Sequence, residues 1–177
     1  ATIHCSGNSN PAFLTSVATS CQAAALRLSG FMQCPFACLG LGDCERACTF
    51  DAIHMNANGL PQVDTGKCTA CPDCRAACPR DLFELAPLKQ NLYVQCNIPL
   101  AGEAATQLCA VACDACGRCA ADAAPGLIRM EGNLPVIDYS AGGPASPEAT
   151  FRCPTSAIVW LEGEQFQDQE SRRVGVG

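Results

Sequence analysis

The sequence predicts an α+β fold made of two tandem copies of one small unit, each with a βαββαβ order of elements. Three observations lead to this prediction. The 177 residues include 16 cysteines, a density typical of disulfide scaffolds and metal-binding proteins. Cysteine blocks of the same spacing occur twice, and each is followed by short strand-like segments. Only 6% of the residues are aromatic, so something besides side-chain packing must help to hold the fold together.

The most informative block of cysteines reads C-x2-C-x2-C-x3-C and is followed at once by Pro79. Its members are Cys68, Cys71, Cys74 and Cys78. Three thiolates at two-residue gaps can converge on one iron–sulfur cube, while the fourth points to a different cube. A four-cysteine zinc site usually has two separate C-x2-C pairs. The spacing therefore predicts ligands of [4Fe-4S] clusters.

An upstream block supplies the partner that this motif requires. It reads C-x3-C-x5-C-x3-C and consists of Cys34, Cys38, Cys44 and Cys48. Between the two blocks, residues 52–55 and 60–64 are predicted strands around an Asn58-Gly59 turn, and residues 82–85 form a closing strand. The order of ligand loop, helix, hairpin, ligand loop, helix and strand resembles that of bacterial two-cluster ferredoxins. The resemblance implies a first domain over residues 1–90, comprising an N-terminal segment and a two-cluster ferredoxin-like unit.

The second half of the chain repeats this layout. Cys109-x3-Cys113-x5-Cys119 aligns without a gap with Cys34-x3-Cys38-x5-Cys44. Strand-like segments at 127–130, 134–138 and 157–160 follow in the same order. We therefore expect a second ferredoxin-like unit over residues 91–165. Residues 166–177 are expected to be a polar tail, with the polar run 162–170 exposed to solvent.

The second copy is degenerate in a coherent way. Ala123 stands in place of Cys48, and a Gly/Pro-rich loop at 142–147 replaces the loop that carries Cys68, Cys71 and Cys74. The four lost cysteines are one complete ligand set, which random loss would seldom remove. Two clusters follow from this comparison, one held by Cys68, Cys71, Cys74 and Cys48, the other by Cys113, Cys116, Cys119 and Cys153. Because the second unit keeps fewer ligands per residue, it is expected to loosen first when metal is removed.

The other eight cysteines suffice for two more clusters, which makes four in all, and they can be divided in two ways. The simpler division groups Cys34, Cys38, Cys44 and Cys78 in one set, and Cys5, Cys21, Cys96 and Cys109 in the other. In the competing division Cys21 and Cys34 change places, because Leu41 occupies the position of a middle ligand that Cys21 could replace. Cys5, Cys34, Cys96 and Cys109 would then bind a cluster on the pseudo-twofold axis between the copies. The sequence favours the first division and leaves the second open.

Several segments resemble one particular family more closely than a generic ferredoxin. They are Cys5-Ser6-Gly7, Cys21-Gln22-Ala23-Ala24, the CLGLGDC run at 38–44, residues 50–55, Asn58-Gly59-Leu60-Pro61 and Cys78-Pro79-Arg80. Together they resemble the soluble part of the RnfB component of the Rnf ion-translocating ferredoxin:NAD oxidoreductase, from about Ile3 to Trp160. The resemblance implies a subunit that accepts electrons from reduced ferredoxin and passes them into a membrane-bound ion pump.

The expected function is therefore relay of single electrons through several [4Fe-4S] clusters, between a low-potential donor and a partner redox subunit of an oxidoreductase complex. No catalytic site of its own is expected. The expected partners are redox protein subunits, such as a ferredoxin or flavoprotein. A zinc- or disulfide-stabilised structural module is the alternative. Gly40 and Gly42 either free backbone N–H groups for cluster sulfurs or serve as ordinary turn residues.

Composition limits the other functions. The formal net charge is −6, with 11 Lys and Arg and no basic cluster, which argues against nucleic-acid binding. No apolar run is long enough to cross a bilayer, so no direct membrane span is expected in this chain. Thiolate ligands require a reducing compartment. We therefore expect a cytoplasmic location, either free or peripheral on the cytoplasmic face of a membrane complex.

Overall fold

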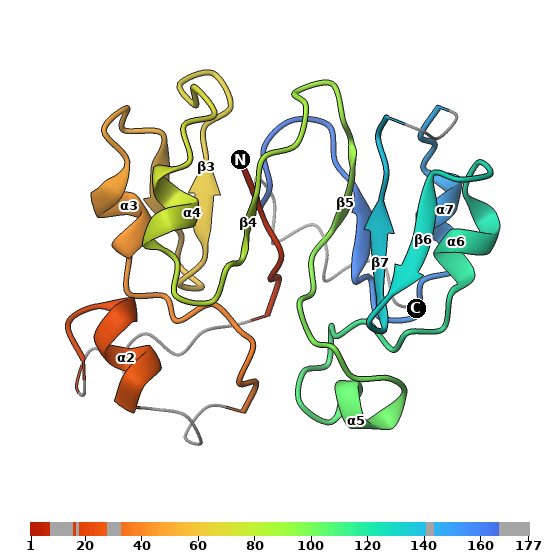
Figure 1. Cartoon of the computed structure of the whole chain (residues 1–177), viewed down its shortest axis with the longest axis horizontal. Helices are drawn as coiled ribbons and strands as arrows, with labels where there is room; N and C mark the ends of the chain where they lie inside the picture. Colours follow the sequence, from red (N-terminus) through yellow and green to blue (C-terminus); the bar gives the residue numbers. More distant parts are fainter. Residues whose placement is uncertain (8–15, 17, 28–32, 141–143, 167–177) are drawn as a thin grey trace.

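The computed structural model describes residues 1–7, 16, 18–27, 33–140 and 144–166. Short helices and strands form two groups that lie side by side along the longest axis (Figure 1). The first half contains β1 (Thr2–Ile3), α2 (Cys21–Arg27), α3 (Asp43–Ala47), β2 (Ile53–Met55), β3 (Pro61–Val63), α4 (Asp73–Ala77) and β4 (Phe83–Glu84). The second half contains β5 (Leu92–Val94), α5 (Glu103–Thr106), α6 (Arg118–Asp122), β6 (Ile128–Glu131), β7 (Leu134–Ile137), α7 (Glu148–Phe151) and β8 (Ile158–Trp160). The mixed α+β class is confirmed.

Strand pairing follows the same scheme in both halves. In the first half β1 pairs with β4 and β2 with β3, and in the second β5 pairs with β8 and β6 with β7. All four pairs are antiparallel, with registers such as Ile3↔Phe83 and Val94↔Ile158. In each half the first strand thus pairs with the last, and the middle two form a hairpin. The predicted strands at 52–55, 60–64, 82–85, 127–130, 134–138 and 157–160 all coincide with observed ones.

These elements are too short to be stable alone. The helices α3, α4 and α6 have five residues each, and isolated helices shorter than about 12 residues are marginal in water. Packing must therefore fix them. In the first half the buried core contains four cysteine side chains, those of Cys5, Cys38, Cys44 and Cys74, together with aliphatic residues and Phe83. Thiols are thus structural members of this core.

The outer core of the second half is aliphatic instead. Its buried members are Leu92, Val94, Leu127, Ile128, Ala149, Ile158 and one cysteine, Cys119. Ala149 aligns with Cys74 and is 1% exposed, and Ala123, which aligns with Cys48, packs against the same core. Where the first half has thiols, the second half therefore has close apolar packing.

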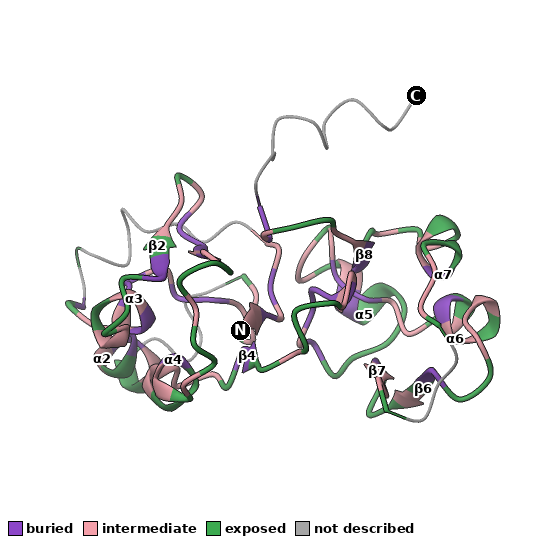
Figure 2. Cartoon of the chain, turned by 90° about the horizontal axis from the view of Figure 1, so that it is seen from above, coloured by how far each residue is buried: buried purple, intermediate pink, exposed green. Residues whose placement is uncertain are grey.

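The segment after β8, residues 161–166, returns from the second half to the first. We call it the C-terminal strap. The expectation of a solvated run over 162–170 is wrong at Gln165 and Phe166, which are only 5% and 7% exposed. Figure 2 shows the buried stretch with which the described chain ends. Phe166 packs into the core of the first half, which removes its ring from water. The remaining residues of the expected tail, 167–177, lie outside the described residues.

Candidate metal centres

The four C-terminal cysteines lie together at the end of the second half, and we call them the second outer set. Cys119 lies in α6, Cys153 follows α7, and Cys113 and Cys116 lie in the loop before α6. Burial raises the pKa of Cys119 to about 11, and the neighbouring thiols of Cys153 and Cys116 act in the same direction. Burial also raises the pKa of Cys113 to about 11, again with Cys119 and Cys153 nearby. Cys116 is the exposed member.

The equivalent place in the first half holds the first outer set, Cys48, Cys68, Cys71 and Cys74. Burial raises the pKa of Cys74, and the adjacent thiols of Cys68 and Cys71 contribute to the rise. Cys48 and Cys68 are half-buried and pack against the core that contains Cys74. The backbone N–H of Ala52 donates to Cys48 Sγ over 3.4 Å. Cys48 directly follows α3 and Cys74 lies in α4, so these two members lie at the junction of the two helices.

A pocket of about 340 Å³, measured with its open mouth, lies beside this junction. Four cysteines line it, and we call them the pocket set: Cys21, Cys38, Cys44 and Cys78. Burial raises the pKa of Cys44 to about 12, with the thiols of Cys21 and Cys78 next in effect. Cys21 reaches the pocket from α2, where the backbone N–H groups of Asp43 and Leu41 face its sulfur. Cys34, which the simpler division places here, is not among the lining residues.

Cys34 lies instead with cysteines from both halves, and we call this group the bridging set: Cys5, Cys34, Cys96 and Cys109. Burial raises the pKa of Cys34, and the neighbouring thiols of Cys109 and Cys96 act in the same direction. Burial likewise raises the pKa of Cys5, with Cys34 and Cys109 contributing. A Cβ placed on Gly7 would lie 3.4 Å from Cys109 Sγ, so the chain after Cys5 contacts the second half directly.

Hydrogen bonds to sulfur repeat between the halves. The N–H of Cys38 donates to Cys5 Sγ over 3.5 Å, and the N–H of Cys113 donates to Cys96 Sγ over 3.2 Å. The thiols of Cys38 and Cys113 each face the carbonyl of the following hairpin turn, at 3.9 and 4.0 Å. Backbone N–H groups near cluster sulfurs tune reduction potential. The repeat thus extends from the sequence to the surroundings of the thiols.

Two equivalent glycines precede helices that each contain one candidate ligand, Cys44 in α3 and Cys119 in α6. Gly42 precedes α3 with φ 73°, and Gly117 precedes α6 with φ 70°. A left-handed residue with a side chain costs about 1–2 kcal/mol, so both Gly42→Ala and Gly117→Ala should lower the free energy of unfolding by about that amount. The Gly42 variant should lose more, because its Cβ meets Glu45 Oε2 at 3.3 Å whereas nothing lies within 4 Å at Gly117. Denaturant titrations of the two variants test this order.

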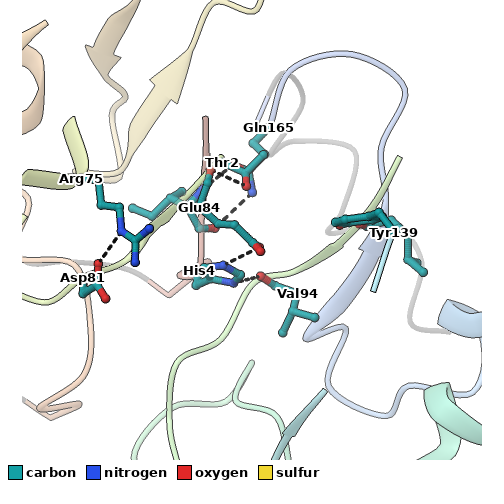
Figure 3. A network of polar contacts seen from close by, with 10 residues as sticks. Thr2, His4, Arg75, Asp81, Glu84, Val94, Tyr139 and Gln165 are labelled. Carbon is teal, nitrogen blue, oxygen red and sulfur yellow. Dashed lines mark hydrogen bonds and ion pairs between the residues drawn. The ribbon is translucent and has the colours of Figure 1, made fainter. Parts of the chain in front are cut away.

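The polar contacts around β1, some of which reach the second half and the C-terminal strap, were not anticipated from sequence (Figure 3). His4 Nδ1 donates to the carbonyl of Val94 over 2.7 Å, and its Nε2 lies 3.1 Å from Glu84 Oε2. This contact with His4 holds the pKa of the Glu84 carboxyl below its usual value. Gln165 hydrogen-bonds the backbone of Ile3. No motif marks these residues, since the partners lie 80 to 162 positions apart.

The donor chemistry of the sites fits iron–sulfur clusters. All sixteen cysteines lie in the described part of the chain as free thiols, and cysteine thiolates are the usual ligands of such clusters. Each set has four thiols, as a [4Fe-4S] cube requires. Within the described residues no three His, Cys, Asp or Glu side chains are placed to hold a single metal ion. The same part of the chain has no helix that is long and apolar enough to span a membrane.

Short paired sheets, helices of four to seven residues and buried thiols define a class of small α+β proteins built around cysteine. Comparison with known proteins shows which of them the chain is similar to. It is 35% identical to the RnfB-type component of the Na⁺-translocating ferredoxin:NAD⁺ oxidoreductase complex of Acetobacterium woodii, over 78% of this chain and 41% of the relative. It is 37% identical to the corresponding component of the proton-translocating complex of Clostridium ljungdahlii, over 84% of this chain and 53% of the relative.

A shorter match reaches an uncharacterized ferredoxin of Methanocaldococcus jannaschii, which is 33% identical over 46% of this chain and 48% of the relative. The chain therefore spans about half the length of the curated relatives that it matches. No family model matches the sequence. Over the region that it shares with the two oxidoreductase components, the chain is RnfB-like.

Proposed function

We propose that this chain is an iron–sulfur electron-transfer subunit, built from two tandem ferredoxin-like units that hold four [4Fe-4S] clusters. One observation carries the proposal: all sixteen cysteines are free thiols, four of them line one pocket, and others have thiol neighbours around Cys5, Cys74 and Cys119. Their division into four sets of four is part of the proposal. The repeated strand pairing supports two copies of one unit. The names of the relatives, a ferredoxin and components of ferredoxin:NAD⁺ oxidoreductases, support the redox function.

For the two irregular clusters we adopt the second division of the ligands. The pocket set of Cys21, Cys38, Cys44 and Cys78 would hold one cluster, because these four side chains line one cavity. The bridging set of Cys5, Cys34, Cys96 and Cys109 would hold the other, because Cys34 and Cys109 neighbour Cys5 and Cys96 neighbours both Cys34 and Cys109. In this division Cys21 takes the place of the middle ligand that is missing at position 41, where the chain has a leucine.

The order of the sites along the molecule suits a relay. Helix α3 contains Cys44 of the pocket set and is followed directly by Cys48 of the first outer set. Helix α4 contains Cys74 of the first outer set and is followed directly by Cys78 of the pocket set. A hydrogen bond from Cys38 to Cys5 joins the pocket set to the bridging set, and one from Cys113 to Cys96 joins the bridging set to the second outer set. In this proposal the sets follow one another as neighbours in the order first outer set, pocket set, bridging set and second outer set.

A bound [4Fe-4S] cluster accepts and releases one electron, and the chain's own groups set how readily it does so. Burial keeps water from the sulfur atoms of Cys5, Cys38, Cys44 and Cys74, all of which are at most 8% exposed. The backbone N–H of Gly40 faces the sulfur of Cys38, which favours the role in sulfur hydrogen bonding over that of a simple turn. Such hydrogen bonds stabilise the reduced, more negative state and raise the potential.

The partners in this proposal are redox protein subunits, with a ferredoxin or flavoprotein as donor or acceptor, and the location is the cytoplasmic face of a membrane complex. The names of the relatives, components of ion-translocating complexes, support both points. Cys116 is the one exposed thiol among the sixteen. Electrons would enter or leave most easily where a ligand reaches the surface, so its surroundings suit contact with a partner.

A simple test separates this function from that of a zinc- or disulfide-stabilised structural module. Protein purified without oxygen should be brown, with broad visible absorbance that dithionite bleaches and air restores. Electron paramagnetic resonance of the reduced protein should show interacting paramagnetic clusters. A colourless chain that contains stoichiometric zinc, or whose thiols are oxidised to disulfides, would contradict the proposal.

A further inference from the structure

Strand β1 has one edge that no strand covers in the described part of the chain. Its other edge pairs with β4, where the N–H of His4 donates to the carbonyl of Leu82 over 2.8 Å. Along an antiparallel strand, successive residues direct their peptide groups to opposite sides. The peptide groups of Ile3 therefore face away from β4. Ile3 is 1% exposed, so these groups need a partner other than water.

The side-chain amide of Gln165 is that partner (Figure 3). Gln165 Oε1 accepts from the N–H of Ile3 over 2.8 Å, and Nε2 donates to the carbonyl of Ile3 over 3.2 Å. One amide thus makes both bonds that a residue of a third strand would make. Gln165 is itself 5% exposed, which makes the pair inaccessible to competing water.

The C-terminal strap brings Gln165 to this position. Beyond β8, the N–H of Leu161 donates to the carbonyl of Asn91 over 2.7 Å, which anchors the strap to the second half. Gln62 in β3 donates to Glu164 Oε2 over 3.2 Å, and Phe166 packs in the core of the first half. The strap is therefore fixed on both sides of Gln165 and at both halves.

Ile3 lies two residues before Cys5, a member of the bridging set. His4, between them, is held to the second half by its bond to the Val94 carbonyl. Cys5 Sγ accepts from the N–H of Cys38 over 3.5 Å, so a small shift of β1 would change both the ligand and its hydrogen bond. The two contacts, at Ile3 and His4, fix the backbone that leads to the thiol.

We propose that Gln165 is a positioning residue for the bridging set: by completing the edge of β1 it fixes the Cys5 thiol relative to Cys34, Cys96 and Cys109. The inference rests on the proposed function, since the bridging set matters as a cluster site. The strap is held in place by Leu161, Glu164 and Phe166. Gln165 makes the contact with β1, the strand that leads to Cys5.

The test uses Gln165→Leu, which keeps the size of the side chain and removes both hydrogen bonds. Gln107→Leu is the matched control, because Gln107 is exposed and its side-chain amide donates to Glu103, four residues earlier in the same segment. In Gln165→Leu the Ile3 amide should exchange hydrogen roughly 5- to 100-fold faster, as expected for loss of a buried hydrogen bond. The paramagnetic signal of one cluster should shift or broaden, and its potential should move, while the other three clusters stay unchanged.

The affected cluster is identified as the one lost in Cys96→Ser. Should Gln165→Leu not fold, Gln165→Glu serves instead, since it keeps an acceptor for the N–H of Ile3 and loses the donor. An unchanged signal from the bridging cluster, or equal changes in all four clusters, would overturn the role of Gln165. Wild-type protein without iron would instead contradict the proposed function, so the two failures can be told apart.

Discussion

Removing iron by anaerobic chelation is expected to unfold the first half of the chain, while the outer part of the second half keeps protection against hydrogen exchange. Small metal-binding domains owe much of their folding free energy to ligation. A domain is stabilised by only about 5–15 kcal/mol in total. The folding free energy lost when the first outer set and the pocket set lose their iron should therefore exceed the stability that the remaining contacts of the first half supply.

The two cores explain the difference between the halves. The first contains four buried cysteines that ligation would hold in place. The second places Ala149, Leu127 and Ile158 around a single buried cysteine, Cys119, and apolar burial contributes about 25 cal/mol per Å² without any metal. The number of ligands per residue alone favours the opposite order of unfolding. The packing seen in the structure reverses that expectation, because alanine and aliphatic side chains fill the place of the lost set.

Hydrogen exchange on carefully prepared apoprotein decides the order. Amides of β2 and β3 should exchange at the rate of an unfolded chain, and those of β6 and β8 more slowly. As a control, the iron-loaded protein should protect both hairpins. Native-like protection of β2 and β3 without iron, or earlier loss at β6 and β8, would show that ligation does not hold the first half together.

Replacing Cys21 and Cys34 one at a time should damage two different clusters. Cys21→Ser is expected to abolish the cluster of the pocket set and to lower the iron content by up to about 4 per chain. Cys34→Ser is expected to abolish the cluster of the bridging set instead, because Cys34 lies beside Cys109 and Cys96. Each substitution removes a whole cluster from the relay. Its effect on electron transfer should therefore be larger than that of a substitution at an exposed residue that binds no cluster.

Matched variants identify the clusters. Cys78→Ser should reproduce the spectrum of Cys21→Ser, and Cys96→Ser that of Cys34→Ser. Cys116→Ser should alter a third signal, that of the second outer set. If Cys34→Ser and Cys78→Ser perturb the same signal, the division that places Cys34 with Cys38, Cys44 and Cys78 is the right one.

Much of the fold could be predicted because its signals are local or repeated. The strands on either side of Asn58-Gly59 follow from the turn residues, and the strands of the second half follow from the alignment of the two cysteine blocks. The grouping of Cys113, Cys116 and Cys119 is likewise local, because short spacing brings ligands to one loop. A pattern of this kind needs no knowledge of tertiary structure.

The rest depends on long-range packing. Whether Cys21 or Cys34 reaches the pocket is decided by how α2 folds against the CLGLGDC loop, which spacing does not encode. Gln165 stands in a polar run in the sequence, yet its partner, Ile3, lies 162 positions away. Phe166 stands in a polar run, and only the core of the first half explains its burial. These residues carry no motif because their roles are set by the fold.

The central claim is that all sixteen cysteines serve as ligands of four clusters. It is tested most directly by quantifying iron and acid-labile sulfide in anaerobically purified protein of known concentration. Four cubes, each with four thiolate ligands, require about 16 iron and 16 sulfide per chain. About 8 of each, with Cys5 and Cys21 open to alkylation in the native state, would contradict the account.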